Sequence, residues 1–181
     1  MTHIEFLLDV FRASAEQAAL VWRDRPFSYG RLAEAIQRWD SELAAHDVAP
    51  GGVVGLEADF SPTSVALLLA LAGRSCVAVP LTSTVEARKP EFRAVAEVET
   101  RLVVDGDDRV SIAPTGARAT HDLYAALRRQ GRPGLVLFSS GSTGRSKAAV
   151  HDLVPLLAKF AVRRRALRTL GFLLFDHVGG V

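Results

Sequence analysis

The segment SPTSVALLLALAGRSCVAVPL, residues 61–81, constrains the fold more than any other part of the sequence. Ser61 and Pro62 are typical of the start of a helix and Gly73 of its end. Between them the residues are apolar almost all round, so this helix has to be buried between layers. The run CVAVPL that follows is uniformly apolar, which is typical of a strand covered on both faces. The chain therefore needs a layered fold with material on both sides of a sheet.

Strands and helices alternate along the rest of the chain. The sequence predicts strands at VVGLEA, RLVVD and GLVLFSS, and helices over KPEFRAVAEVE and DLYAALRRQG, the second closed by Gly131. Crossovers of this length favour parallel pairing with right-handed connections. Short strands are also expected at Val110–Ala113 and KAAVHD, then a helix from Asp152 to about Arg168 and a last apolar strand. We expect an α/β fold of layered parallel or mixed sheets flanked by helices.

The N-terminal region is predicted to be helical. Residues 1–25 read as an amphipathic helix with a polar tail, and a second helix follows with Ser28 as its N-cap. Trp22 and Trp39 are interpreted as packing residues on these early helices.

Composition limits the classes of function. The 181 residues suffice for one domain or two unequal lobes, and the polar segment 106–120 is the only candidate boundary between lobes. A net charge of +2 gives little support to nucleic-acid binding. The single cysteine, Cys76, fits a reducing cytoplasm. The longest apolar run, Val65–Ala72, is too short to span a bilayer, and five scattered histidines make a structural zinc site unexpected.

The loop after the GLVLFSS strand carries the chemistry. It reads LVLFSSGSTGRSKAAVH over residues 135–151, and it combines hydroxyl donors, two glycines and one lysine. Glycines let the backbone amides approach an anion closely, while hydroxyls and a cation line the rim. We interpret the loop as a phosphate-binding site. Its predicted contacts are Ser139, Ser140, Gly141, Ser142, Thr143, Gly144 and Lys147.

The loop sequence fits two other kinds of loop less well. A Walker A loop requires Gly before the lysine and Ser or Thr after it, but Ser146 precedes Lys147 and Ala148 follows it. A flexible surface linker would not be expected between two apolar segments such as LVLF and AAV.

The same residues resemble a known family. LFSSGSTGRSKAAVH is similar to the phosphate-loop signature of the adenylate-forming, AMP-binding enzymes, which include the acyl-CoA synthetases of fatty acid metabolism, luciferases and the adenylation domains of peptide synthetases. Ser146 replaces the usual proline and Ala148 the usual glycine. RPFSYGRLAEAI, LLALAGRSCVAVPLTSTV and LLFDHVGGV resemble further segments of the family in the same order.

The resemblance implies a two-step ligase reaction. A carboxylic acid attacks the α-phosphorus of ATP, which is used with Mg²⁺, and an acyl-adenylate and pyrophosphate form. A thiol of coenzyme A or of an acyl-carrier protein then accepts the acyl group. The loop would hold the β- and γ-phosphates, and His177 and Gly179 would lie near the acyl pocket. The run FLLFDHVGG favours an acyl or aryl acid over an amino acid.

The family's acidic magnesium motif, ribose-binding aspartate and C-terminal lysine have no counterpart in this sequence. Residues 1–181 are therefore expected to be an N-terminal fragment of the large domain, inactive alone. A non-catalytic nucleotide- or partner-binding module and a phosphotransferase remain as alternatives. The RRRALR run, residues 163–168, is interpreted as a solvated helix face or as a pocket for coenzyme A phosphates.

Overall fold

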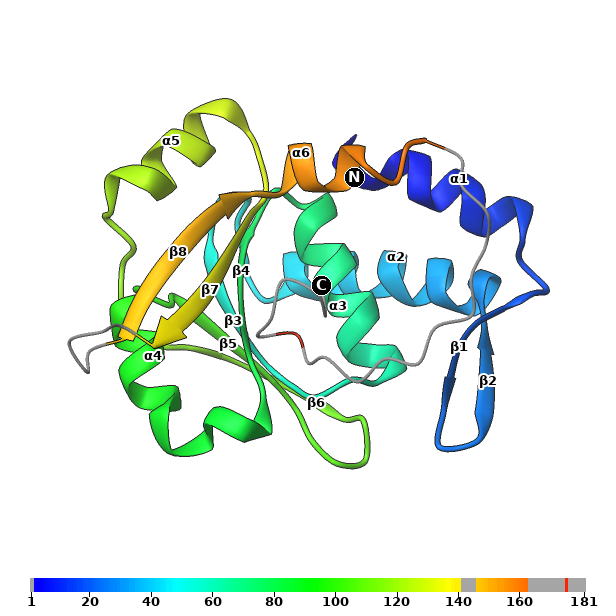
Figure 1. Cartoon of the computed structure of the whole chain (residues 1–181), viewed down its shortest axis with the longest axis horizontal. Helices are drawn as coiled ribbons and strands as arrows, with labels where there is room; N and C mark the ends of the chain where they lie inside the picture. The colour runs from blue at the N-terminus through cyan, green and yellow to red at the C-terminus, as the bar shows by residue number, and fades with distance from the viewer. Residues whose placement is uncertain (1, 141–145, 163–174, 176–181) are drawn as a thin grey trace.

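The computed structural model describes residues 2–140, 146–162 and 175 (Figure 1). The elements in chain order are η1 (Thr2–Ile4), α1 (Glu5–Ala13), β1 (Ala18–Trp22), β2 (Arg25–Ser28), α2 (Tyr29–Ala45), β3 (Val53–Glu57), α3 (Pro62–Gly73), β4 (Val77–Leu81), η2 (Ser83–Arg88), α4 (Lys89–Val95), β5 (Thr100–Val104), β6 (Val110–Pro114), α5 (Asp122–Gln130), β7 (Gly134–Ser140), β8 (Ser146–Asp152) and α6 (Leu153–Ala158).

A six-stranded mixed sheet forms the centre of the molecule. Its strand order is β6-β5-β3-β4-β7-β8, in which the four inner strands are parallel and each edge strand is antiparallel to its neighbour. The predicted α/β class and the parallel central strands are confirmed. β6 and β8 were both expected as short strands. Each pairs in an antiparallel hairpin with the strand before it, and they form the two edges of the sheet.

Helices cover both faces of this sheet. One core cluster joins α1, α2 and α3 to one face, and a second joins α4 and α5 to the other (Figure 1). Side chains alternate between the two clusters along β3, β4 and β7: in β7, Leu135 and Leu137 belong to the first and Val136 to the second. This burial on both faces explains why these three strands are mostly apolar.

The buried helix predicted from the sequence is α3. Ser61 Oγ accepts from Ser64 N at 3.0 Å and Ser64 Oγ accepts from Ser61 N at 2.8 Å, which makes a reciprocal capping box, and Pro62 occupies the first turn. Leu67 and Leu71 are completely buried, and each such side chain stabilises the fold by roughly 1.5–3 kcal/mol. Gly73 is the last residue of the helix itself.

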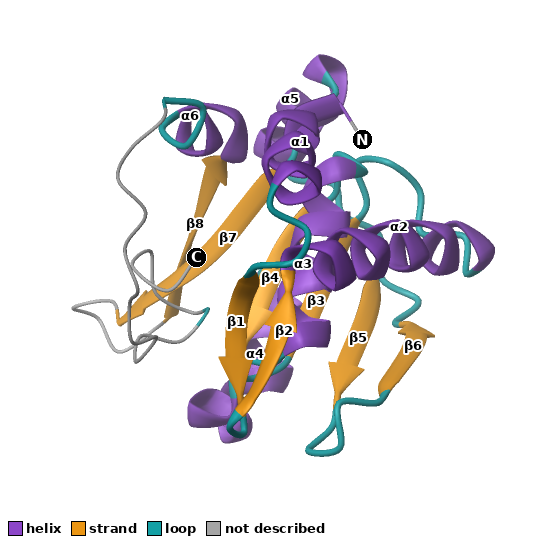
Figure 2. Cartoon of the chain, turned by 90° about the vertical axis from the view of Figure 1, so that its right-hand side faces the viewer, coloured by secondary structure: helices purple, strands orange, loops and turns teal. Residues whose placement is uncertain are grey.

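The prediction of a helix over residues 1–25 is only partly right. α1 ends at Ala13, and β1 and β2 then form a separate antiparallel hairpin (Figure 2). Its two-residue turn places Arg23 and Asp24 at φ +50° and +60°, the conformation that two-residue hairpins prefer but that usually recruits Asn or Gly. The absence of those turn residues hid the hairpin in the sequence. Trp22 therefore lies on a strand, while Ser28 does cap α2 by accepting from Arg31 N.

The helix expected from Asp152 to about Arg168 is shorter in the structure. It begins at Leu153, one residue after the predicted start, and the Asp152 side chain caps it by accepting from Val154 N at 2.9 Å, but α6 ends at Ala158. The arginine run 163–168 and the expected last strand, apart from Phe175, lie outside the described residues.

Candidate functional site

The carboxyl ends of the four parallel strands define one edge of the sheet. The connection that leaves β3 runs into α3 on one face, and the connection that leaves the adjacent β4 runs into α4 on the other. Ligands of open α/β sheets bind outside the carboxyl ends of the strands, where neighbouring connections diverge in this way. β7 lies next to β4 and also ends at this edge, at Ser140, where the predicted phosphate loop begins.

The loop is carried by the hairpin of β7 and β8. In the antiparallel register Ser139 lies opposite Lys147, and Ser140 lies opposite Ser146. Side chains of directly opposed residues share a face, with Cβ atoms about 4.5–5.5 Å apart. The Ser139 hydroxyl and the Lys147 ammonium thus lie on the same face of the hairpin, and both residues are exposed.

The alternation of side chains shows which face this is. Leu135 and Leu137 belong to the cluster of α1, α2 and α3, and Ser139 is the next residue of that series. Phe138 packs against the opposite cluster, beside α4. Ser139 and Lys147 therefore face the side of the sheet that α3 covers. Lys147 forms no ion pair with a carboxylate in the described residues, so its charge is available to an anion.

The segment of η2 and α4 contacts the strands on both sides of the loop. Phe92 stacks on Phe138, immediately before the loop, with ring centroids 4.0 Å apart. After the loop, Ser146 Oγ donates to Glu91 Oε1 at 2.5 Å and also bonds the Arg88 guanidinium, which in turn lies over the Phe92 ring. The hydrogen bond from Ser146, followed by that from Arg88, lowers the pKa of Glu91. Residues of η2 and α4 therefore contact both the strand residue that precedes the loop and the strand residue that follows it.

A buried carboxylate lies at the end of β3. Glu57 is 4% exposed, and its Oε1 accepts from Arg93 at 2.9 Å and from Arg101 at 2.8 Å, while Lys89 Nζ lies 3.9 Å from its Oε2. Burial on its own would raise the pKa of Glu57, but the hydrogen bonds and charges of Arg101 and Arg93 outweigh burial and hold it below its usual value. This cluster connects β3, α4 and β5 next to the carboxyl edge, and it holds α4 in place.

One residue near the C-terminus is also fixed at this edge. Phe175 is 2% exposed, and its ring lies 4.1 Å from that of Phe60, which follows β3. Phe175 therefore lies on the α3 side of the sheet, and it is two positions before the predicted acyl-pocket residue His177 in the sequence. His177 and Gly179 themselves lie outside the described residues.

The structure thus describes only part of the predicted site. Ser139, the backbone of Ser140, and Lys147 are described, and the register brings Ser139 and Lys147 together. The remaining loop residues are outside the described ranges: Gly141, Ser142, Thr143 and Gly144.

Sequence reasoning missed the supports of the loop. Glu57 carried a visible signal, since a carboxylate that ends an otherwise apolar strand must be paired if it is buried. Glu91 and Arg88 carried none, because they are an ordinary exposed pair one helical turn apart until folding brings Ser146 to them. Among the described residues no group of three or more acidic, histidine or cysteine side chains could hold a metal ion. No helix in those ranges is both long and apolar enough to cross a membrane.

The architecture matches several solved structures. The N-terminal subdomain of Klebsiella oxytoca NpsA, in complex with 3-hydroxybenzoyl-AMSN, superposes with a TM-score of 0.61 at 22% identity over 81% of this chain and 39% of that chain. CmiS6 matches with a TM-score of 0.63 at 17% identity over 87% and 41%. An artificially fused adenylation–PCP di-domain, NpsA-ThdA from the same Klebsiella species, matches with a TM-score of 0.63 at 21% identity over 82% and 32%. The chain thus spans less than half the length of these relatives.

The fold defined by the sheet, its two helical layers and the β7–β8 hairpin is therefore part of the N-terminal subdomain of an adenylation fold. The chain belongs to the AMP-binding enzyme family, whose model matches residues 9–181. The resemblance found in the sequence is confirmed. No curated protein matches this chain.

Proposed function

We propose that this chain forms the phosphate-binding part of an ATP-dependent ligase that activates a carboxylic acid as its acyl-adenylate and releases pyrophosphate. The observation that carries the proposal is the β7–β8 register, which sets Ser139 opposite Lys147 at the start of a glycine- and hydroxyl-rich loop. Membership of the AMP-binding family supports the use of ATP.

The chemistry assigned to the loop is electrostatic. Cleavage between the α- and β-phosphates develops negative charge on the pyrophosphate, and fixed donors near that charge lower the barrier. Lys147 would supply the cation, and the hydroxyls and amides of residues 139–144 would supply hydrogen bonds. Mg²⁺ would arrive on the triphosphate, since it is bound mainly through phosphates and few carboxylates.

The acid and the acceptor are further parts of the proposal. NpsA was solved with a 3-hydroxybenzoyl-AMSN ligand, and its fused form carries a PCP domain. We therefore propose an aryl acid as the first substrate class to test, and the thiol of a carrier protein before coenzyme A. His177 and Gly179 are proposed to line the pocket for the acid. The protein is proposed to act in the cytoplasm.

Nucleotide binding by the 181-residue chain is the direct test. Calorimetric titration with Mg·ATP should give binding in the millimolar to micromolar range, and Lys147→Ala should weaken it about 10- to 100-fold, because a charged contact is worth about 1.5–3 kcal/mol. Lys159→Ala is the matched control, since Lys159 is an equally exposed lysine just after α6. Equal affinity of the wild type and Lys147→Ala would overturn the assignment of the loop.

Acid-dependent exchange of labelled pyrophosphate into ATP tests the reaction. We expect none from the 181-residue chain, and exchange from a polypeptide in which this chain is followed by the remainder of an adenylation domain. Formation of ADP instead would favour a phosphotransferase. Nucleotide binding without any acid-dependent exchange in that longer polypeptide would favour a non-catalytic binding module.

A further inference from the structure

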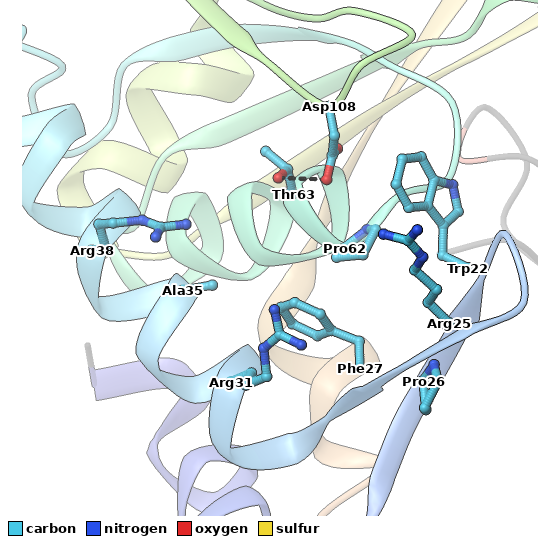
Figure 3. A pocket seen from close by; sticks show the side chains of 10 residues that line it. All are labelled: Trp22, Arg25, Pro26, Phe27, Arg31, Ala35, Arg38, Pro62, Thr63 and Asp108. Carbon is cyan, nitrogen blue, oxygen red and sulfur yellow. Dashed lines mark hydrogen bonds between the residues drawn. The ribbon is translucent and has the colours of Figure 1, made fainter.

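A concave site lies on the α2 side of the molecule, and none of its described lining residues belongs to the phosphate loop. Its volume is about 300 Å³, and it opens between the β1–β2 hairpin, α2, the start of α3 and the β5–β6 turn (Figure 3). The residues that line it are Trp22, Arg25, Pro26, Phe27, Arg31, Ala35, Arg38, Pro62, Thr63 and Asp108. The proposed ligase function uses none of them.

The lining carries an excess of positive charge. Arg25, Arg31 and Arg38 converge on the cavity from β2 and α2, and in the described part of the chain none of them forms an ion pair. Glu34 lies one turn from both Arg31 and Arg38, yet neither arginine pairs with it. Asp108 is the one acidic residue among the described residues of the lining. These described residues therefore give the site a formal charge of +2, and guanidinium groups are well suited to phosphate oxygens.

The same cavity has an aromatic wall. Trp22 and Phe27 are half-buried on the hairpin, and the Arg31 guanidinium lies 4.7 Å from the centre of the Phe27 ring. The hairpin is tied down by Arg23, which donates to Gly106 O at 2.7 Å, so this wall is fixed relative to the β5–β6 turn. A flat ring can stack on such a surface, and drug-sized ligands favour sites of this volume and mixed lining.

One acceptor in the cavity lining has no partner. Asp108 Oδ2 accepts from Thr63 Oγ1 at 2.9 Å, whereas Asp108 Oδ1 is buried and makes no hydrogen bond to the described residues (Figure 3). Asp108 is held at φ +65°, a backbone conformation that ordinary residues rarely adopt. A buried carboxylate oxygen without a donor is costly, so a ligand N–H or O–H in this position would be favourable.

We propose that this cavity binds an aromatic phosphomonoester that also carries an N–H or O–H donor. The phosphate, with a charge of about −1.5 to −2 at neutral pH, matches the excess of arginine charge better than a monocarboxylate would. The ring packs on Trp22 and Phe27, and the donor satisfies Asp108 Oδ1. A nucleoside monophosphate and a simple aminoaryl phosphate share this chemistry.

The test uses four probes on the 181-residue chain: 4-aminophenyl phosphate, phenyl phosphate, inorganic phosphate and AMP. The chain has only two tryptophans, and Trp22 alone of the two lines the cavity, so the Trp22 indole NMR resonance reports on it. We expect 4-aminophenyl phosphate to shift the Trp22 resonance and to bind about tenfold more tightly than inorganic phosphate, because the ring adds about 1.5 kcal/mol. Tighter binding of AMP would identify a nucleotide as the source, and tighter binding of 4-aminophenyl phosphate an aryl phosphate.

Variants assign the contacts. Arg31→Gln should weaken binding about fivefold, the effect of one solvent-exposed charge contact of about 1 kcal/mol, whereas Arg118→Gln changes an exposed arginine outside the cavity and should have no effect. Asp108→Asn should abolish the preference for 4-aminophenyl over phenyl phosphate. Asparagine tolerates positive φ, so this variant should retain the turn.

The proposed phosphate loop is tested separately in the same titrations. Lys147→Ala should leave the shift of Trp22 unchanged, so a failure of the ATP assignment and a failure of this one are distinguishable. The proposal is overturned if no probe moves the Trp22 resonance, if Arg31→Gln and Arg118→Gln bind alike, or if Lys147→Ala abolishes the Trp22 shift.

Discussion

The ring of Phe92 in α4 lies flat on the ring of Phe138 in β7, with centroids 4.0 Å apart and planes inclined by 4°. Phe138 immediately precedes Ser139, so this contact fixes the strand that enters the phosphate loop. The Arg88 guanidinium also lies over the Phe92 ring, 4.7 Å from its centre, and bonds Ser146, where the chain leaves the loop. In this chain Ser146 occupies the position of the family's usual proline, and the side-chain contacts to Arg88 and Glu91 provide a restraint that a proline ring would supply covalently.

Phe92 is the first position to test. It is 4% exposed, and replacing it with Ala should lower the free energy of unfolding by about 3–5 kcal/mol, because the stacked ring is lost and a cavity remains. Denaturant titration of the 181-residue chain measures this. Phe160→Ala, at a position that is 63% exposed, is the control and should change stability by less than about 0.5 kcal/mol. Equal effects of the two variants would contradict the packing described here.

Ser146 should control the titration of Glu91. Its hydroxyl donates to the Glu91 carboxylate and thereby lowers the pKa of that group, so Ser146→Ala should raise the pKa of Glu91 toward its usual value. Ser146→Thr retains the hydroxyl and should leave the pKa low. Side-chain carboxyl NMR chemical shifts followed against pH provide the measurement. An unchanged pKa in Ser146→Ala would show that Glu91 and Ser146 are not bonded in solution.

Glu57 should stabilise the fold in a pH-dependent manner. Its folded pKa is lowered, so its contribution is present above its ordinary value of 4.5 and is lost as the pH falls through the folded pKa. Glu57→Gln leaves Arg93 and Arg101 near an uncharged buried amide, and at neutral pH we expect a loss of about 3 kcal/mol. This loss is at the lower end of the range for breaking a buried ion pair, because Arg101 is partly exposed to water.

Denaturant unfolding at neutral and at acid pH tests the Glu57 prediction. The difference in stability between wild type and Glu57→Gln should shrink as the pH is lowered below about 4.5. Glu42→Gln, which removes an exposed carboxylate that forms no ion pair among the described residues, should track the wild type. If the difference in unfolding free energy between wild type and Glu57→Gln were constant across the pH range, Glu57 would stabilise the fold through packing and not through its charge.

Cys76 should be inert in the folded chain. The residue is completely buried, and burial raises the pKa of its thiol to about 12, so almost no thiolate forms at mildly alkaline pH. Its reaction with a thiol-specific disulfide reagent should be slow without denaturant and should accelerate in step with global unfolding. Rapid reaction of the native chain would contradict the burial of Cys76, which directly precedes β4.

The sequence predicted those parts of the fold whose signals are local. Ser61, Pro62 and the apolar run after them indicated a capped, buried helix, and the uniformly apolar β4 indicated a sheet covered on both faces. Gly131 was predicted to end a helix, and it does so at φ +60°. The N-terminal hairpin was missed because Arg23 and Asp24 form its turn without the Asn or Gly that marks such turns.

One part of the candidate site could be predicted from residues that are close together in the sequence, and another part could not. Residue types and spacing in SSGSTGRSK were sufficient to propose a phosphate loop, because glycines, hydroxyls and one cation are needed close together in the chain. The pairing of Ser139 with Lys147 depends on the register of two strands, which a hairpin fixes only when it folds.

The amino-acid sequence by itself determined the class of fold, the alternation of strands and helices from β3 to β8, and the family, since each depends on neighbouring residues and on apolar periodicity. Only the tertiary structure decided that α4 holds both ends of the loop and that three arginines line a cavity in which one Asp108 oxygen has no partner among the described residues. Those contacts join residues tens of positions apart. Whether they meet depends on how the layers pack on the sheet, which no local pattern specifies.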